Sequence, residues 1–147
     1  MTPERLHLLA QVHAFLGWVA VGALIVPAVL LFRPRRRFGL VAMLATIVAT
    51  VAGVLGGVLY AWYTPLLKRA IYVASFGHGL AMERKEHLAV LALALAWAGA
   101  LGHLASDRDA EVARVRAVFA HGAYVAAALL ALTVALLGNA VASIRSF

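Results

Sequence analysis

Cysteine is absent from the 147-residue chain, and only six residues are Asp or Glu. Without cysteine there is no disulfide, no thiolate zinc site, no iron–sulfur cluster and no cysteine nucleophile. Covalent attachment of a c-type haem, which requires a C-x-x-C-H sequence, is excluded as well. No nucleophile–base pair, phosphate-binding loop or acidic dyad is visible. We therefore do not expect a stand-alone enzyme.

Charged residues are also scarce, at 13% of the chain, whereas 65% of the residues are hydrophobic. Soluble domains are only about 45–50% apolar. A membrane span needs about 20 apolar residues, and its backbone polar groups must be satisfied internally, which favours helices. We predict an all-α fold, an integral membrane four-helix up-down bundle that forms a single transmembrane domain over residues 1–147. Its helices are expected at about residues 6–32, 39–63, 86–105 and 117–142.

The connections differ in length and polarity. The Arg33–Arg37 turn and the link between the last two helices are short, so each joins two neighbouring antiparallel helices. The 64–85 connection is longer and semi-apolar. We expect it to lie in the membrane interface as a short amphipathic helix that ends at Gly77-His78-Gly79. Four crossings place both termini and this loop on one side, called side A, and the two short links on side B.

The formal charge of +7 comes from basic residues that flank the apolar runs. In that position they meet lipid headgroups and set orientation, and no nucleic-acid module is present. The densest basic cluster, at residues 33–37, lies on side B next to the first helix, which usually dominates orientation. We expect side B to be cytoplasmic and both termini periplasmic. The Ala-, Leu- and Arg-rich composition suggests the inner membrane of a high-GC bacterium.

Apart from Glu86, which bounds the third span, histidine is the one ionisable residue type that falls inside the predicted spans, and an ionisable residue at that depth is by default a functional hypothesis. The four histidines within the spans are His13, His87, His103 and His121. Two further histidines, His7 and His78, lie nearer the side-A surface and are alternates.

The histidines of the last two helices are expected at similar depths in the membrane, which makes them a pair. His103 precedes Asp107 by four residues, which is about 6 Å at helical rise. His121 follows Arg116 by five residues, or about 7.5 Å. Because a short link joins the two helices, these histidines are expected at matched depth, where one ligand can bind between two imidazoles.

A second pair, His13 and His87, is expected towards side A, with a looser match in depth. Small residues near the histidines either leave room for a flat cofactor or let helices approach closely. The sequence leaves both uses open for these glycines, which are Gly17, Gly53, Gly56, Gly57, Gly99 and Gly102.

Together the pairs predict one or two non-covalent b-type haems, with the four span histidines as iron ligands. His87 and His103 are 16 residues apart, which corresponds to about 24 Å and to about 160° around the helix. A single haem would be simpler. In that case depth favours His103 with His121, whereas the surrounding glycines favour His13 with His87.

The chain resembles the small four-helix b-type cytochrome subunits of respiratory enzymes. It is also similar to an uncharacterised family of bacterial four-helix membrane proteins with histidines at the start of helices one (His7, His13) and three (His87) and a Gly-rich end to helix two (Gly56–Tyr60). The spacing of 16 residues is longer than in two-haem cytochromes b. The resemblance implies haem ligation by facing histidines and electron exchange with quinone.

Three functions remain open from the sequence. The first is an electron-transfer subunit that binds haem b and passes electrons between a partner redox protein and quinone. The second is a haem-free structural or assembly subunit of a larger membrane complex. The third is a histidine-based metal or proton carrier, although the spans contain no acidic residue and the chain has only three methionines. The expected partners are the lipid bilayer and other subunits of a membrane redox complex, with no nucleic acid.

Overall fold

The structure is a computed structural model that describes residues 3–30, 38–105 and 109–143. This part of the chain is all-helical, which confirms the all-α part of the predicted fold class. Four of its helices are long and apolar enough to cross a membrane. The five helices are α1 (Pro3–Val29), α2 (Phe38–Leu66), α3 (Lys68–Ala74), α4 (Phe76–Leu104) and α5 (Ala110–Ala142).

The 64–85 connection differs from the expectation in where its break falls. The break is at Ser75, whose backbone is extended (φ −162°, ψ 114°), and α4 begins directly after it. Gly77-His78-Gly79 therefore lies inside α4 and does not end a helix. A helical glycine costs only about 1 kcal/mol, and the His78 ring lies 2.8 Å from the Ser75 hydroxyl across the break. The first turns of α4 thus occupy residues that were expected to form a loop.

Helix α5 also begins earlier than expected, at Ala110 rather than near residue 117. The reason is an N-cap at Asp109. Its carboxylate accepts hydrogen bonds from the backbone N–H groups of Glu111, at 2.8 Å, and Val112, at 3.3 Å. This cap satisfies donors that the first turn leaves free, and it carries α5 well beyond the end of α4.

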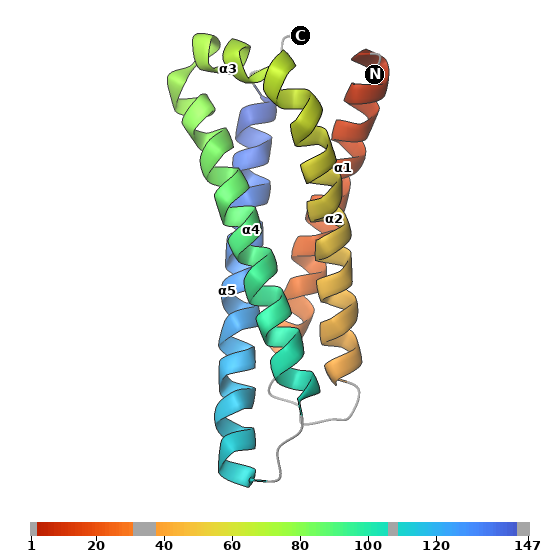
Figure 1. Ribbon diagram of the computed structural model, residues 1–147, viewed down its shortest axis with the longest axis vertical. Coiled ribbons are helices and arrows are strands. Elements are labelled where there is room, and N and C mark those ends of the chain that lie inside the picture. Colours follow the sequence, from red (N-terminus) through yellow and green to blue (C-terminus); the bar gives the residue numbers. More distant parts are fainter. Residues whose placement is uncertain (1–2, 31–37, 106–108, 144–147) are drawn as a thin grey trace.

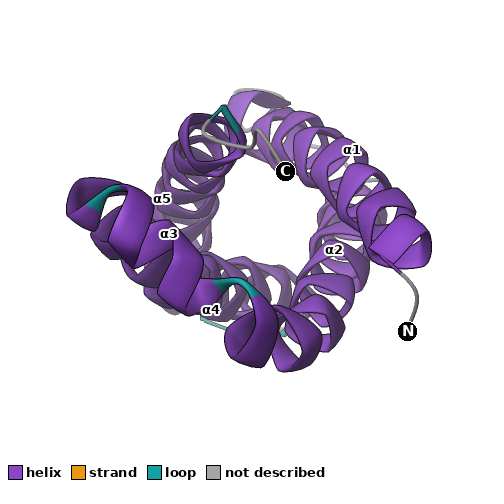
Figure 2. Ribbon diagram, turned by 90° about the horizontal axis from the view of Figure 1, so that it is seen from above, coloured by secondary structure: helices purple, strands orange, loops and turns teal. Residues whose placement is uncertain are grey.

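The four long helices lie side by side in an elongated bundle (Figure 1). Seen from above, they form a ring in the order α1, α2, α4, α5 (Figure 2). In agreement with this order, α1 and α4 each contact α2 and α5. Helices α1 and α4 therefore stand at opposite corners. The two termini and α3 lie at one end of the bundle, here called the side-A end, and the opposite end is the side-B end.

Small side chains fill the centre of the bundle, and large apolar side chains point outwards. Phe15 is 69% exposed and Val90 is 69% exposed. Such an arrangement suits an apolar solvent, because small residues at helix contacts let the backbones pack closely. The buried alanines are Ala20, Ala42, Ala45, Ala49, Ala52, Ala92, Ala96, Ala100, Ala120, Ala123, Ala127 and Ala128.

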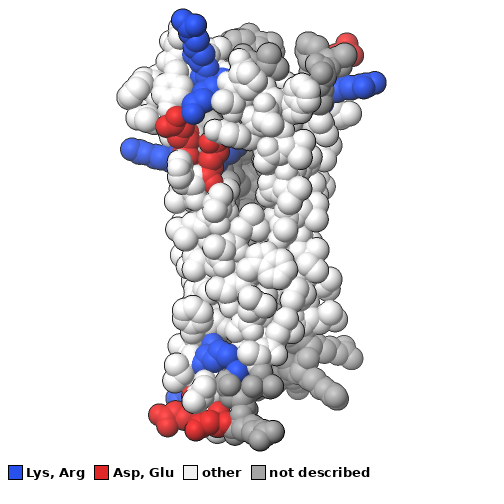
Figure 3. Space-filling model, viewed as in Figure 1, with Lys and Arg blue, Asp and Glu red and all other residues white. Residues whose placement is uncertain are grey.

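Many of the buried residues in the described part of the chain belong to one of two separate clusters. The main cluster includes Leu24 and Tyr124 and occupies the middle and the side-B part of the bundle. A small one, Ile71 with Val141, lies under α3 at the side-A end. On the face shown in Figure 3, the charged side chains gather towards the two ends and leave an uncharged band between them.

Candidate functional site

His103 and His121 are brought together at the side-B end of the contact between α4 and α5. Both side chains are half-buried, and the two imidazoles lie within electrostatic range of each other. Arg116 of α5 joins them, because it also interacts electrostatically with His103. Its Cγ atom lies 4.0 Å from the position that a Cβ on Gly102 would take. The structure therefore adds to the expected imidazole pair a guanidinium from Arg116, a residue just outside the predicted fourth helix.

Close packing between α4 and α5 surrounds this cluster. A Cβ on Gly99 would lie 2.7 Å from Cδ2 of Tyr124 and 3.0 Å from the carbonyl oxygen of Ala120. A Cβ on Gly102 would lie 2.9 Å from the Ala120 Cβ. These two glycines accept the side chains and backbone of α5. They serve helix packing, which is the second of the two uses that the sequence left open.

Tyr124 carries a buried hydrogen-bond network from α5 across the bundle to α2. Its hydroxyl lies 2.7 Å from the carbonyl oxygen of Ala42 and 2.7 Å from the hydroxyl of Thr46. The Thr46 hydroxyl is also 3.3 Å from the carbonyl oxygen of Ala96 on α4. Tyr124 and Thr46 are both 0% exposed. Their hydrogen bonds offset the free-energy cost of burying a hydroxyl group in an apolar interior.

The same tyrosine helps to orient His103. The two rings stack with an interplanar angle of 22° and a centroid separation of 6.2 Å. Tyr124 and Thr46 were not predicted from the sequence, because neither side chain carries a charge at neutral pH. The signal was a hydroxyl-bearing side chain in the interior of an apolar run, where an unpaired hydroxyl is costly.

His13 lies in the part of α1 that faces α2. Its ring packs on Gly56, where an added Cβ would lie 2.8 Å from the ring carbon Cε1. Its Nδ1 atom is buried and has no hydrogen-bond partner within the described part of the chain. Gly56 thus makes room for an imidazole. Of the other glycines near side A, Gly53 faces Leu93 of α4, whereas Gly17 and Gly57 have no such atom within 4 Å.

His87, the expected partner of His13, does not face it. The His87 side chain is exposed, and its Nδ1 lies 2.8 Å from the carbonyl oxygen of Glu83 on its own helix. Lys85 interacts electrostatically with His13 instead, and its side chain packs towards Gly138 of α5. Helix geometry explains why Lys85, and not His87, lies on the face towards His13. Lys85 is seven residues from the buried Ala92 and lies on the same face, whereas His87 is five residues away and about 140° around.

The two alternates make local contacts near the side-A end. The His7 ring lies 3.0 Å from the Gln11 amide nitrogen one turn along α1, and His78 contacts Ser75 as described above. Within the described residues, no group of three or more His, Asp or Glu side chains is arranged to hold a metal ion.

A bis-histidine haem makes two demands on this site. The donor set at the side-B end meets the first, since it offers two imidazoles for the iron and a guanidinium for a propionate. The second demand is space, because the porphyrin must lie between the two imidazoles. The closed contact at Gly99 and Gly102 does not leave that space between α4 and α5.

A comparison of the chain with protein-family models, with curated proteins and with solved structures finds no match.

Proposed function

We propose that this chain is a haem-free structural subunit of a larger bacterial membrane complex. Its four long helices cross the inner membrane as an up-down bundle, with side B in the cytoplasm and both termini in the periplasm. The alanine interior and the outward-pointing large apolar side chains support membrane insertion. A reporter fused to the C-terminus tests the orientation, and a cytoplasmic signal would reverse it.

One observation carries the choice of a haem-free role, namely the close approach of α4 and α5 at Gly99 and Gly102. Of all the pairs of helices in the bundle, these two make the most extensive contact. Inserting a porphyrin between His103 and His121 would break that contact and expose packed alanines. The tightly packed interior suits a rigid scaffold, and the broad apolar exterior suits burial against lipid and neighbouring subunits.

Two measurements test this proposal together. Protein produced with an ample haem supply and purified in mild detergent is expected to lack a b-type α-band in reduced-minus-oxidised spectra. Mass spectrometry of the protein content of polymer nanodiscs is expected to find partner chains together with the 15.6 kDa chain. A stoichiometric α-band, or a particle that contains a single chain and no partner, would overturn the proposal.

The second candidate function is electron transfer through haem b, and the cluster of His103, His121 and Arg116 favours it. In that case the two histidines hold the iron and Arg116 pairs with a propionate. When bound, the haem would supply one-electron transfer, with a partner redox protein and quinone as donor and acceptor. Because α4 and α5 are closed, they would have to separate near Gly99 to admit it.

Histidine substitutions decide between the two candidates if an α-band appears. Loss of the band in His103→Ala and His121→Ala, with retention in His7→Ala, would establish the second candidate. Retention in both of the first two variants would exclude the side-B site. A metal-carrier role gains no support from the geometry, because the Arg116 guanidinium beside the imidazoles disfavours a bare cation.

A further inference from the structure

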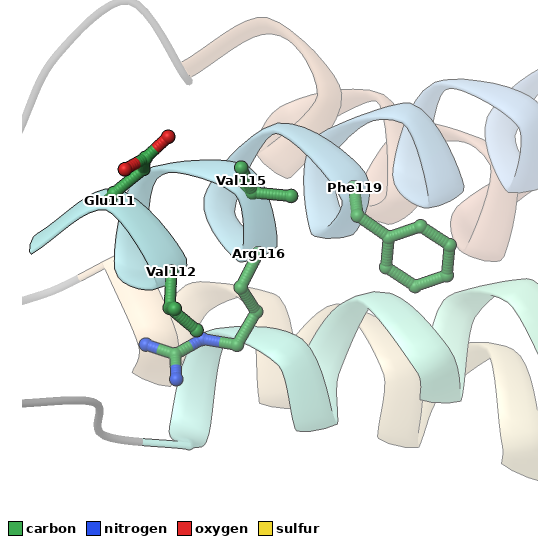
Figure 4. A pocket seen from close by; sticks show the side chains of 5 residues that line it. All are labelled: Glu111, Val112, Val115, Arg116 and Phe119. Atoms are coloured by element: carbon green, nitrogen blue, oxygen red, sulfur yellow. The ribbon is translucent and has the colours of Figure 1, made fainter. Parts of the chain in front are cut away.

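A cavity of about 530 Å³ opens on the outer surface of α5 at the side-B end. Figure 4 shows the Arg116 and Phe119 side chains on one side of α5, with the guanidinium beside Val112. Its lining residues are Glu111, Val112, Val115, Arg116 and Phe119.

The apolar walls of this cavity are exposed to whatever surrounds the bundle. Val115 is 65% exposed and Phe119 is 62% exposed. Arg116 differs, because it is half-buried and its stem packs towards Gly102 of α4. The cavity therefore combines a cation held in place at its base with apolar walls that no other described helix covers.

The depth of the cavity places it at the boundary between hydrocarbon and headgroups. Helix α5 has 33 residues, about 50 Å at helical rise, whereas the hydrocarbon core is about 30 Å thick. The charged residues of α5, Glu111, Arg114 and Arg116, all lie in its first two turns, so these turns are the ones that extend into the headgroup region. Arg116 follows the start of the helix by six residues, or about 9 Å, and Phe119 lies about one turn deeper.

Along α5, from the hydrocarbon outwards, the cavity presents an apolar ring (Phe119), then a cation (Arg116), then an anion (Glu111). At the lower end of the face shown in Figure 3, basic side chains likewise lie above acidic ones. A phospholipid with an amine headgroup has the complementary order, which is acyl chain, phosphate, ammonium. Guanidinium groups pair with phosphate through several hydrogen bonds, and a carboxylate accepts hydrogen bonds from a primary ammonium.

We propose that this cavity binds a phosphatidylethanolamine, with its phosphate on Arg116, its ammonium on Glu111 and an acyl chain along Phe119. The site needs no haem, and Arg116 is the residue that it shares with the second candidate function, where it would pair with a propionate. It depends on the proposed membrane location, which the reporter fusion tests separately.

Native mass spectrometry of the delipidated full chain, titrated with phosphatidylethanolamine, phosphatidylcholine or phosphatidylglycerol, tests this site. Wild-type protein is expected to retain phosphatidylethanolamine at least threefold better than the other two. The reason is that choline offers no N–H group to Glu111, and the glycerol headgroup offers no positive charge. Equal retention of all three lipids would overturn the proposal.

Two charge substitutions assign the residues. Glu111→Lys is expected to reverse the preference towards phosphatidylglycerol, because the cavity then carries two cations. Arg116→Gln should lower retention of all three lipids, which share the phosphate. Arg114→Gln is the matched control, since Arg114 is exposed on the same helix but does not line the cavity.

An unchanged lipid preference in Glu111→Lys, or an equal loss in Arg114→Gln and Arg116→Gln, would show adventitious surface binding and overturn the site. If Arg116→Gln does not fold, Val115→Asp replaces it. Val115 is mostly exposed, so its fold should persist, and the added negative charge should lower retention of all three lipids. Unchanged retention in Val115→Asp would likewise overturn the proposal.

Discussion

The two ends of the bundle use the same kinds of residue in opposite ways. Near side B, Gly99 meets the Tyr124 ring and the Ala120 backbone, and the histidine of α4 stands beside that of α5. Near side A, the three atoms nearest to a Cβ on Gly56 would all belong to the side-chain ring of His13. Rigidity is therefore concentrated in the side-B half, where a neighbouring backbone limits adjustment.

The largest expected effect tests that rigidity. Gly99→Leu would drive a side chain into Tyr124 and the Ala120 carbonyl group, and overpacking of this kind costs about 3 kcal/mol at its upper range. The free energy of unfolding in mixed detergent and SDS measures it. Gly22→Leu is the control, because no such heavy atom lies within 4 Å of its Cβ position. Equal losses of stability in the two variants would contradict the close packing of Gly99 against Tyr124 and Ala120.

Tyr124→Phe should have the next largest effect. It removes the hydroxyl that links α5 to Thr46 and Ala42 of α2. Buried hydrogen bonds between membrane helices contribute about 0.6 kcal/mol on average and up to about 1.7 kcal/mol, and we expect the upper part of that range. The same unfolding measurement applies. Tyr60→Phe, at a 41% exposed position, should leave stability unchanged, and an equal loss there would remove the special role of the network.

Gly56→Ala tests whether packing in the side-A half can adjust to an added side chain more easily than packing in the side-B half. Alanine gains about 1 kcal/mol in helix propensity over glycine, which the displacement of the His13 ring should roughly cancel. In a His13→Ala background the same change should therefore stabilise by about 1 kcal/mol. Gly99→Ala should not gain this stability in any such background, because its Cβ would also meet the backbone carbonyl oxygen of Ala120, which cannot be removed by substitution. Independence of positions 56 and 13 in the double-mutant cycle would show that their contact is absent.

The smallest effect is expected at the Lys68–Glu83 ion pair, which joins α3 to α4 at 2.8 Å. Its hydrogen bond to Glu83 raises the pKa of Lys68. The contribution is therefore present below the ordinary lysine pKa and is lost as the pH rises through the raised value. Lys68→Ala should speed amide hydrogen exchange in α3 at neutral pH, and this difference should shrink in alkaline solution or high salt. Arg69→Ala is the control, and equal acceleration there would remove the role of the pair.

Much of the helical content could be predicted from the sequence, because long apolar runs without acidic residues are visible in one dimension. The matched depth of His103 and His121 was predictable for the same reason, since a short link fixes two helices side by side. The starts of α4 and α5 were not, because they depend on local hydrogen bonds at Ser75 and Asp109. The pairing of His13 with His87 was not found, because depth along a helix does not determine which way a side chain points.

By itself, the sequence determined that the chain is all-helical, that four helices are long and apolar enough to cross a membrane, and that two histidines near side B occupy one level. Only the tertiary structure decided the rotation of each helix about its axis. The alanine faces must pack against one another, and that requirement turns Lys85 and His103 inwards and His87 outwards. It also decided that Gly99 and Gly102 pack against α5. Two helices in such close contact leave no room between them at this level for a flat cofactor.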